Sequence, residues 1–283
     1  MMKALRLLIT GGATGFGQAL ALTWAKHHQQ TATLKVCIAD IHEARGQETV
    51  AKLTQRGTEA FFSRCDITSE ADIHATKQEI IKRWQGVDVV INNAGVATGG
   101  SLKGESLEQW QWVFNINLFG MVKVCQSFVE VFRQQGQGYF INIASQAGLT
   151  PIPLMGSYNA VKAGVVSFSE TLKSELAPEN IDVSVVCPSF FRTNLDESMR
   201  TREQFMRDSI SRQFNKAEMT AEQVAEEVWR QTQKRQFLII THKSGKAAYY
   251  MKKWLPMDWY LSKIIKATRK MVLKAKEGQV DNG

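Results

Sequence analysis

Proline and long apolar runs are scarce in this sequence of 283 residues. It has 5 Pro and 20 Gly, too few for a low-complexity linker protein. No run of about 18 apolar residues is present, so no membrane-spanning helix is expected. The opening segment MMKALRLLIT has too short an apolar stretch for a secretory signal. These features predict a folded, cytoplasmic protein.

Cysteine and histidine are few and lack the spacing of a metal site. The four Cys are widely separated, without a C-x-x-C pair, which favours reduced thiols over a disulfide framework or a zinc site. The five His show no ligand spacing either, so we expect no metal. The cysteines are Cys37, Cys65, Cys125 and Cys187, and the histidines are His27, His28, His42, His74 and His242.

Positive charge is confined to the C-terminal part of the chain. The formal net charge is +8, yet residues 243–276 hold ten Lys or Arg and a single acid, Asp258. The rest of the chain is therefore nearly neutral. Because the body carries no basic excess, we expect no nucleic-acid partner.

Short apolar runs alternate with longer segments of helical periodicity. Continuous apolar runs fit strands buried on both faces of a parallel sheet, and the alternation predicts a doubly wound α/β fold. The runs are 5–10, 34–40, 60–65, 87–91, 139–144, 183–187 and 237–240. The predicted helices are 16–28, 43–55, 70–84, 107–135, 157–177 and 220–234.

No composition break divides residues 1–245, which we therefore interpret as one domain. Residues 188–219 form a long insert between a strand and a helix, and such inserts are often lids over a site. Residues 246–283 are predicted to form a basic helical extension.

A glycine-rich turn, Gly11 to Gly17, lies between the first predicted strand and the first predicted helix. Glycines at this place permit a tight turn and let backbone N–H groups approach a pyrophosphate at the helix N-terminus. A glycine cluster in this context predicts dinucleotide binding.

The second predicted strand ends at Asp40, 23 residues after Gly17. A carboxylate there can accept hydrogen bonds from the ribose hydroxyls of the adenosine half and would repel a 2′-phosphate. NAD(H) is therefore preferred over NADP(H), although the nearby Arg45 and His42 keep NADP(H) open. Asp40 could also serve as a helix cap.

Three motifs together resemble the short-chain dehydrogenase/reductase family over about residues 4–240. They are T-G-x-x-x-G-x-G at 10–17, Asn92-Asn93-Ala94-Gly95, and Tyr158-x-x-x-Lys162 preceded by Ser145. The resemblance implies a Rossmann-type, seven-stranded sheet and NAD(P)-dependent hydride transfer.

The resemblance also implies roles for individual residues. Asn117, Ser145, Tyr158 and Lys162 would form the catalytic set, with Asn117 preferred over the neighbouring Asn115. The cofactor would contact Gly11, Thr14, Gly15, Phe16, Gly17, Asp66, Ile67, Asn93, Ala94, Gly95, Pro188 and Thr193, together with Tyr158 and Lys162. Ser189 stands where the family pattern has Gly. Family members are commonly dimers or tetramers, which here would use 107–135 and 157–177.

The chemistry of the Tyr–Lys pair follows from the residue types. A phenol with a pKa near 10 is a weak acid–base group at neutral pH, and a neighbouring cation favours the phenolate. Lys162 is four residues after Tyr158, so the two share one face of a helix. Ser145, at the end of the strand 139–144, can hydrogen-bond the substrate oxygen as charge develops.

The segments around this set are mostly apolar. Leu149, Leu154, Phe190 and Phe191 are expected to line a pocket for a hydrophobic alcohol, aldehyde or ketone. The alternative is that these side chains pack the lid.

Residues 257–276 have the pattern of an amphipathic helix with a basic face, and Trp and Tyr precede it. This pattern is typical of peripheral binding to an anionic membrane. Packing on the body or on a second subunit is the alternative.

Two other functions stay open at this point. One is an NAD(H)-binding redox sensor with little turnover, and the other is a scaffold that uses the tail.

Overall fold

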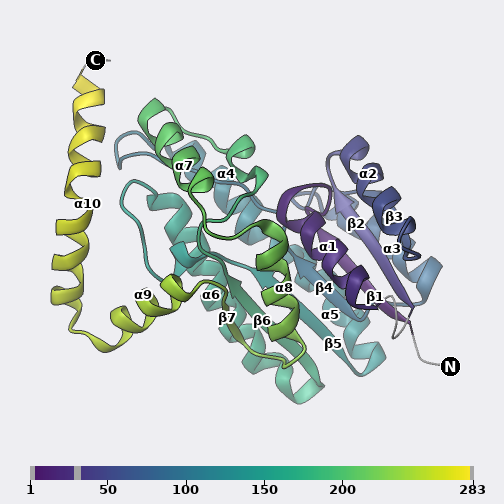
Figure 1. Ribbon diagram of the computed structural model, residues 1–283. Helices are drawn as coiled ribbons and strands as arrows, with labels where there is room; N and C mark the ends of the chain where they lie inside the picture. Colours follow the sequence, from purple (N-terminus) through teal and green to yellow (C-terminus); the bar gives the residue numbers. More distant parts are fainter. Residues whose placement is uncertain (1–3, 29–32, 281–283) are drawn as a thin grey trace.

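The computed structural model describes residues 4–28 and 33–280 and contains one parallel sheet of seven strands in that part of the chain (Figure 1). The strand order is β3-β2-β1-β4-β5-β6-β7. The strands are β1 (Leu5–Thr10), β2 (Leu34–Asp40), β3 (Glu59–Arg64), β4 (Val89–Asn92), β5 (Gly138–Ile143), β6 (Ile181–Cys187) and β7 (Leu238–Ile240). Each predicted run therefore matches a strand to within two residues at either end, and the doubly wound fold is confirmed.

Helices cover both faces of the sheet. They are α1 (Gly15–His28), α2 (Glu43–Thr54), α3 (Glu70–Trp84), α4 (Leu107–Phe114), α5 (Met121–Gln135), α6 (Gly156–Leu176), α7 (Gln204–Asn215), α8 (Ala221–Thr232), α9 (Lys243–Trp254) and α10 (Met257–Val280). Successive side chains of a strand point to opposite faces. Leu7 and Ile9 accordingly pack with α1 and α8, and Leu8 packs with α3 and α5.

The helix predicted over 107–135 is interrupted. A π-helical segment, Asn115–Gly120, separates α4 from α5. Inside it the side chain of Asn117 pairs with the backbone of Val96, accepting its N–H at 2.8 Å and donating to its carbonyl at 2.9 Å. A π-helical turn places one extra residue in the helix and is frequent at functional sites. Here it orients Asn117 toward the loop that follows β4.

The insert predicted at 188–219 contains a short 3-10 helix, Asn194–Ser198, and α7. Its backbone is tied to the loop after β4, because the N–H of Arg200 donates to the carbonyl of Ala97 at 3.1 Å. Met199, Met206 and Ile210 are buried in a cluster that also includes Tyr158. The insert is thus an ordered cover over one side of the sheet edge.

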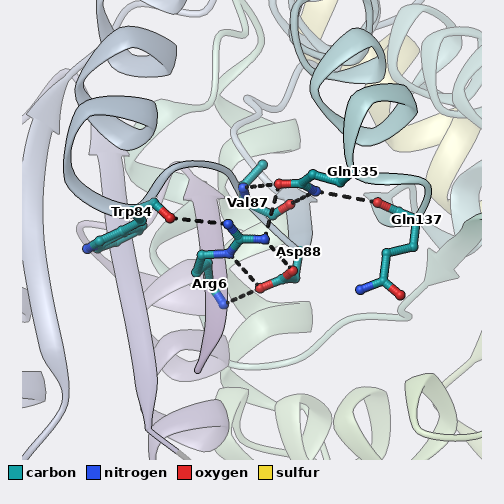
Figure 2. A network of polar contacts seen from close by, with 6 residues as sticks. All are labelled: Arg6, Trp84, Val87, Asp88, Gln135 and Gln137. Carbon is teal, nitrogen blue, oxygen red and sulfur yellow. Dashed lines mark hydrogen bonds and ion pairs between the residues drawn. The ribbon is translucent and has the colours of Figure 1, made fainter. Parts of the chain in front are cut away.

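At the opposite, amino edge of the sheet, a largely buried ion pair connects three segments (Figure 2). The guanidinium of Arg6 donates two hydrogen bonds to Asp88, at 2.7 and 2.9 Å, and one to the carbonyl of Trp84 at 3.2 Å. It also donates to Gln135 of α5, whose amide pairs with the backbone of Val87. A bidentate Arg–carboxylate pair is strong and directional, so this network fixes β1, the start of β4 and the end of α5.

The chain ends in two helices at the edge of the molecule farthest from α2 and α3 (Figure 1). α9 packs on β7, and α10 contacts α7 of the insert and α9. No helix within the described ranges is long and apolar enough to cross a membrane.

Candidate active site

A large cavity opens at the carboxyl edge of the sheet, where the strand order reverses between β1 and β4. Its volume is about 1620 Å³. Ligands of doubly wound sheets bind at this kind of crevice. Most of the predicted site residues line it: Gly11, Thr14, Gly15, Phe16, Asp40, Asp66, Ile67, Asn93, Ala94, Gly95, Ser145, Tyr158, Lys162, Pro188, Phe190, Phe191 and Thr193.

The glycine turn has the shape of a phosphate cradle. Gly11 has φ +63° and Gly15 has φ +54°, values that glycine adopts without strain. A Cβ on Gly11 would lie 2.7 Å from the Cα of Ala94, and one on Gly17 would overlap the carbonyl of Gly11. Gly17 does not line the cavity itself, so its role is to let the turn close tightly.

Asn93 holds the glycine turn against the end of β4. Its side-chain amide donates to the carbonyls of Thr10 and Gly11 at 3.1 and 2.8 Å. The hydroxyl of Thr10 accepts the N–H groups of Asn93 and Ala94. The loop after β4 therefore determines the position of the turn.

Asp40 connects the turn to the end of β2. One carboxylate oxygen accepts the N–H of Ala13 and the other that of His42, both at 3.0 Å. A carboxylate has about four acceptor positions, so both oxygens can accept further hydrogen bonds. The nearby Arg45 is ion-paired with Glu197 of the insert at 2.9 Å. Both Arg45 and Glu197 line the same end of the cavity.

Asp66 forms a compact turn after β3. It accepts hydrogen bonds from the N–H and hydroxyl of Thr68 at 2.8 and 2.7 Å. Ile67 is buried beside it and packs close to Gly120, where a Cβ would lie 2.7 Å from the Ile67 side chain. Asp66, Ile67 and Thr68 all line the cavity, and Ile67 is the apolar residue among them.

Tyr158, Lys162 and Ser145 meet at the carboxyl ends of β5 and β6. Tyr158 and Lys162 are one turn apart on α6, and the Lys162 Nζ lies 5.8 Å from the centre of the Tyr158 ring. The Lys162 ammonium donates to the carbonyl of Ile143, the last residue of β5, at 3.0 Å. Ser145 caps the short helix Gln146–Gly148 by accepting the N–H of Ala147. The hydrogen bond to Ile143 thus fixes Lys162, and with it the predicted acid–base site, at the end of the sheet.

Burial shifts the protonation of both groups away from their charged forms. It raises the pKa of Tyr158 to about 12, and a hydrogen bond with Ser145 acts in the opposite direction. It lowers the pKa of Lys162 to about 8, and the nearby Cys187 acts to raise it. At neutral pH, Tyr158 therefore holds its proton, and the Lys162 side chain is mostly charged.

The N-terminus of α6, which carries Tyr158, is fixed by a residue that the sequence did not indicate. The carboxylate of Glu105 accepts the N–H of Ser157 at 3.0 Å and its hydroxyl at 2.6 Å. The Ser157 hydroxyl also pairs with Thr98 at 2.7 Å. Glu105 is 52 residues away from Ser157 in the chain, so no local motif could reveal the contact.

The polar residue that lines the cavity from the π-helical segment is Asn115, and Asn117 is fully buried behind Val96. Asn117 therefore holds the loop after β4 in place. Its side chain lies outside the cavity lining.

Phe190 and Phe191 line the cavity, whereas Leu149 and Leu154 do not. Leu149 packs in the core beneath α6, and Leu154 has φ +64° and packs against the cluster around Tyr158. The apolar lining also includes Met155 and Met199, which belong to the apolar segments around the catalytic set. Sequence reasoning missed three further lining residues: Trp112 of α4, Ile210 of the insert and Ala248 of α9. Their only sequence signal is apolar character, which core residues share.

Within the described ranges, no three His, Cys, Asp or Glu side chains are grouped so that they could hold a metal ion. The four cysteines lie in these ranges and are free and buried.

Comparison with known proteins gives one consistent family. The chain matches the short chain dehydrogenase family over residues 6–204. It is 29% identical to the CLA biosynthesis dehydrogenase/reductase of Lactiplantibacillus plantarum, covering 83% of this chain and 87% of that protein. It is 31% identical to the 3-oxoacyl-[acyl-carrier-protein] reductase FabG of Chlamydia trachomatis, covering 68% and 76%.

Solved structures agree with this relationship. A short chain dehydrogenase/reductase of Burkholderia phymatum in complex with NAD has a TM-score of 0.82 and 28% identity, covering 89% of this chain and 94% of that one. The 3-ketoacyl-(acyl-carrier-protein) reductase of Brucella melitensis, complexed with NADH, has a TM-score of 0.71 and 25% identity, covering 84% and 96%. The chain therefore belongs to the short-chain dehydrogenase/reductase family and is an NAD(P)-dependent oxidoreductase that acts on CH–OH or C=O groups.

Proposed function

We propose that this enzyme transfers a hydride between NAD(H) and an alcohol or carbonyl compound that carries an apolar chain, with Tyr158 as the acid–base group. The observation that carries the proposal is that one cavity joins the glycine turn, Asp40 and the Tyr158–Lys162 pair to an apolar lining.

The cofactor end supports NAD(H). Bound NADH would supply the hydride. The glycine turn and the N-terminus of α1 would hold its pyrophosphate, and the free acceptor positions of Asp40 would take ribose hydroxyls. A 2′-phosphate would approach the Asp40 carboxylate and meet an Arg45 that is already paired with Glu197. Both effects disfavour NADP(H).

The residues of α6 and β5 provide the proton chemistry. Tyr158 is protonated at neutral pH, which is the form that donates a proton to a carbonyl oxygen. The charged Lys162 side chain would stabilise the phenolate that remains, and the carbonyl of Ile143 holds it in place. The hydroxyl of Ser145 can donate a hydrogen bond to the same substrate oxygen.

The substrate end supports an apolar chain. Phe190, Phe191, Met199 and Ile210 line it, and Trp112 does so under the guanidinium of Arg200, 3.8 Å from the ring centre. The Chlamydia and Brucella relatives are named for acyl substrates bound to a carrier protein, which fits a site of this character.

A turnover screen tests the proposal. Carbonyl compounds of increasing chain length are offered with NADH and with NADPH, and nicotinamide oxidation is followed by absorbance. We expect kcat/KM to rise with chain length and to favour NADH. Values that do not change with chain length would refute the substrate class, and a preference for NADPH would refute the role of Asp40.

A further inference from the structure

Exposed apolar side chains are concentrated on the last two helices. Thirteen large apolar side chains are exposed in the described part of the chain, and eight of them lie between residues 250 and 273. Trp254 is 75% exposed and Ile265 is 66% exposed. We name the eight the tail surface: Tyr250, Met251, Trp254, Met257, Trp259, Leu261, Ile265 and Leu273. Exposed large apolar side chains gathered on neighbouring helices in this way mark sites of interaction with a protein or a membrane.

The same helices are strongly basic. Nine Lys or Arg lie between residues 243 and 274, against the single acid Asp258. Cations and aromatic rings alternate along the surface: Lys253 lies 5.7 Å from the ring centre of Trp254, and Lys263 lies 4.8 Å from that of Trp259. The tail surface is therefore both apolar and positively charged.

α9 has the tail surface on one side and the substrate cavity on the other. Ser244, Gly245 and Ala248 line the cavity. At about 100° per residue, Tyr250 lies about 160° and Trp254 about 120° around the helix from Ala248. They are exposed. A single helix therefore separates the cavity from the tail surface.

α10 connects the tail surface to the insert. Tyr260 is buried, and α10 contacts α7, whose Ile210 lines the cavity. On the adjacent side of α10, Leu261 and Ile265 are exposed one turn apart. The tail surface therefore adjoins two elements that line the cavity, α9 and α7.

We propose that the tail surface binds the face of an anionic lipid bilayer, with α9 and α10 at the interface and the substrate cavity directly behind α9. Trp and Tyr are favoured at the level of the lipid headgroups, and amphipathic helices with Lys-rich polar faces lie in that layer. The positive charge complements anionic lipids. A second copy docked by two-fold symmetry would instead bring the same basic patch against itself.

This position would give the enzyme access to substrates dissolved in the bilayer. A molecule with a long apolar chain partitions into lipid, and its route to the cavity would pass α9 without crossing bulk water. This consequence rests on the proposed function, whereas the binding of the tail surface to lipid does not depend on it.

Vesicle co-sedimentation of the full-length protein tests the binding. The vesicles consist of phosphatidylcholine with or without phosphatidylglycerol. We expect the protein to pellet with the anionic vesicles and to be released by salt. Lys263→Glu/Lys270→Glu should weaken binding at least 25-fold, since each removed positive charge accounts for about fivefold. Trp254→Ser should weaken it about tenfold.

The matched control is Ile81→Ser/Lys82→Glu on α3, which lies on the opposite side of the molecule (Figure 1). It should bind vesicles like the wild type. The proposal is supported if the tail variants lose vesicle binding while their circular dichroism spectra stay like that of the wild type and the control variant still binds. Absent binding, or equal binding to both vesicle types by all variants, would overturn it. A wild-type dimer in sedimentation equilibrium that Trp254→Ser converts to monomer would assign the surface to a second copy and also overturn it.

Turnover of a short, water-soluble substrate separates the two proposals. Vesicle binding without any turnover would refute the proposed function alone. Turnover without vesicle binding would refute the membrane contact alone.

Discussion

Glu105 links the loop after β4 to the first turn of α6, and its removal should lower stability and turnover together. The side chain is buried, and it accepts the Ser157 N–H and hydroxyl. In Glu105→Ala the Ser157 hydroxyl keeps Thr98 as a partner, but the N–H loses its acceptor. Hydrogen bonds to a charged group contribute about 1.5–3 kcal/mol each, and an orphaned buried donor costs about 1–3 kcal/mol. We therefore expect the free energy of unfolding to fall by about 2–4 kcal/mol.

Catalysis should suffer because Ser157 immediately precedes Tyr158. A shift of about 1 Å in a catalytic group can cost on the order of 100-fold in rate, so we expect kcat to fall about 10- to 100-fold with little change in NADH affinity. Glu105→Gln is the matched control. Its amide oxygen can accept the Ser157 N–H, and its NH₂ can donate to the Ser157 hydroxyl, so it should retain most of both properties.

Urea unfolding followed by Trp fluorescence and steady-state kinetics measure the two effects. Wild-type stability and turnover in Glu105→Ala would refute the reasoning.

The pH dependence of stability is a second check on Glu105. Burial raises the pKa of Glu105, so the folded state keeps a proton that the unfolded chain releases above about 4.5. The stability contribution of Glu105 is therefore complete below that value and declines as pH rises through the folded pKa. Glu105→Gln should gain stability relative to the wild type over that interval.

Three further substitutions test the cofactor and acid–base residues. Gly17→Ala should abolish NADH binding in calorimetry, because its Cβ would overlap the Gly11 carbonyl; wild-type affinity would contradict this. Asp40→Ser can still accept the Ala13 N–H, and it should raise the NADPH-to-NADH ratio of kcat/KM at least about tenfold by removing the repelling charge; an unchanged ratio would contradict the assignment. Burial lowers the pKa of Lys162 to about 8 from 10.5, so the folded state loses this proton first. The free energy of unfolding of the wild type should therefore rise between pH 8 and 10.5. In urea titrations Lys162→Met should not show this rise, and equal pH dependence in the two proteins would refute the shift.

The sequence predicts the sheet well because most of its strands are buried on both faces, although the edge strand β3 is only half-buried. In Leu34–Asp40, for example, every residue except Lys35 and Asp40 is apolar, and the glycine turn follows β1 directly. The positions of Ser145, Tyr158 and Lys162 follow from local order, since Ser145 lies two residues after a strand and the other two share a helix face. Local patterns of this kind survive in the folded protein because tertiary contacts reinforce them.

Features that depend on distant contacts are not visible in the sequence. The π-helical segment exists where Asn117 pairs with Val96, 21 residues away. Leu149 and Leu154 are apolar and near Ser145 in the chain, but whether they face the cavity depends on how the segment before α6 packs. The small residues Ser244 and Gly245 line the cavity from α9 and have no hydrophobic pattern that would indicate it.

The most direct test of the central claim is the turnover of Tyr158→Phe with NADH and an apolar carbonyl compound. The substitution removes one hydroxyl from a buried ring and leaves the glycine turn and Asp40 unchanged. The account predicts NADH binding at wild-type affinity and a loss of kcat of about 100- to 10,000-fold, the usual contribution of a general acid. Wild-type turnover in this variant would contradict the assignment of Tyr158 as the acid–base group.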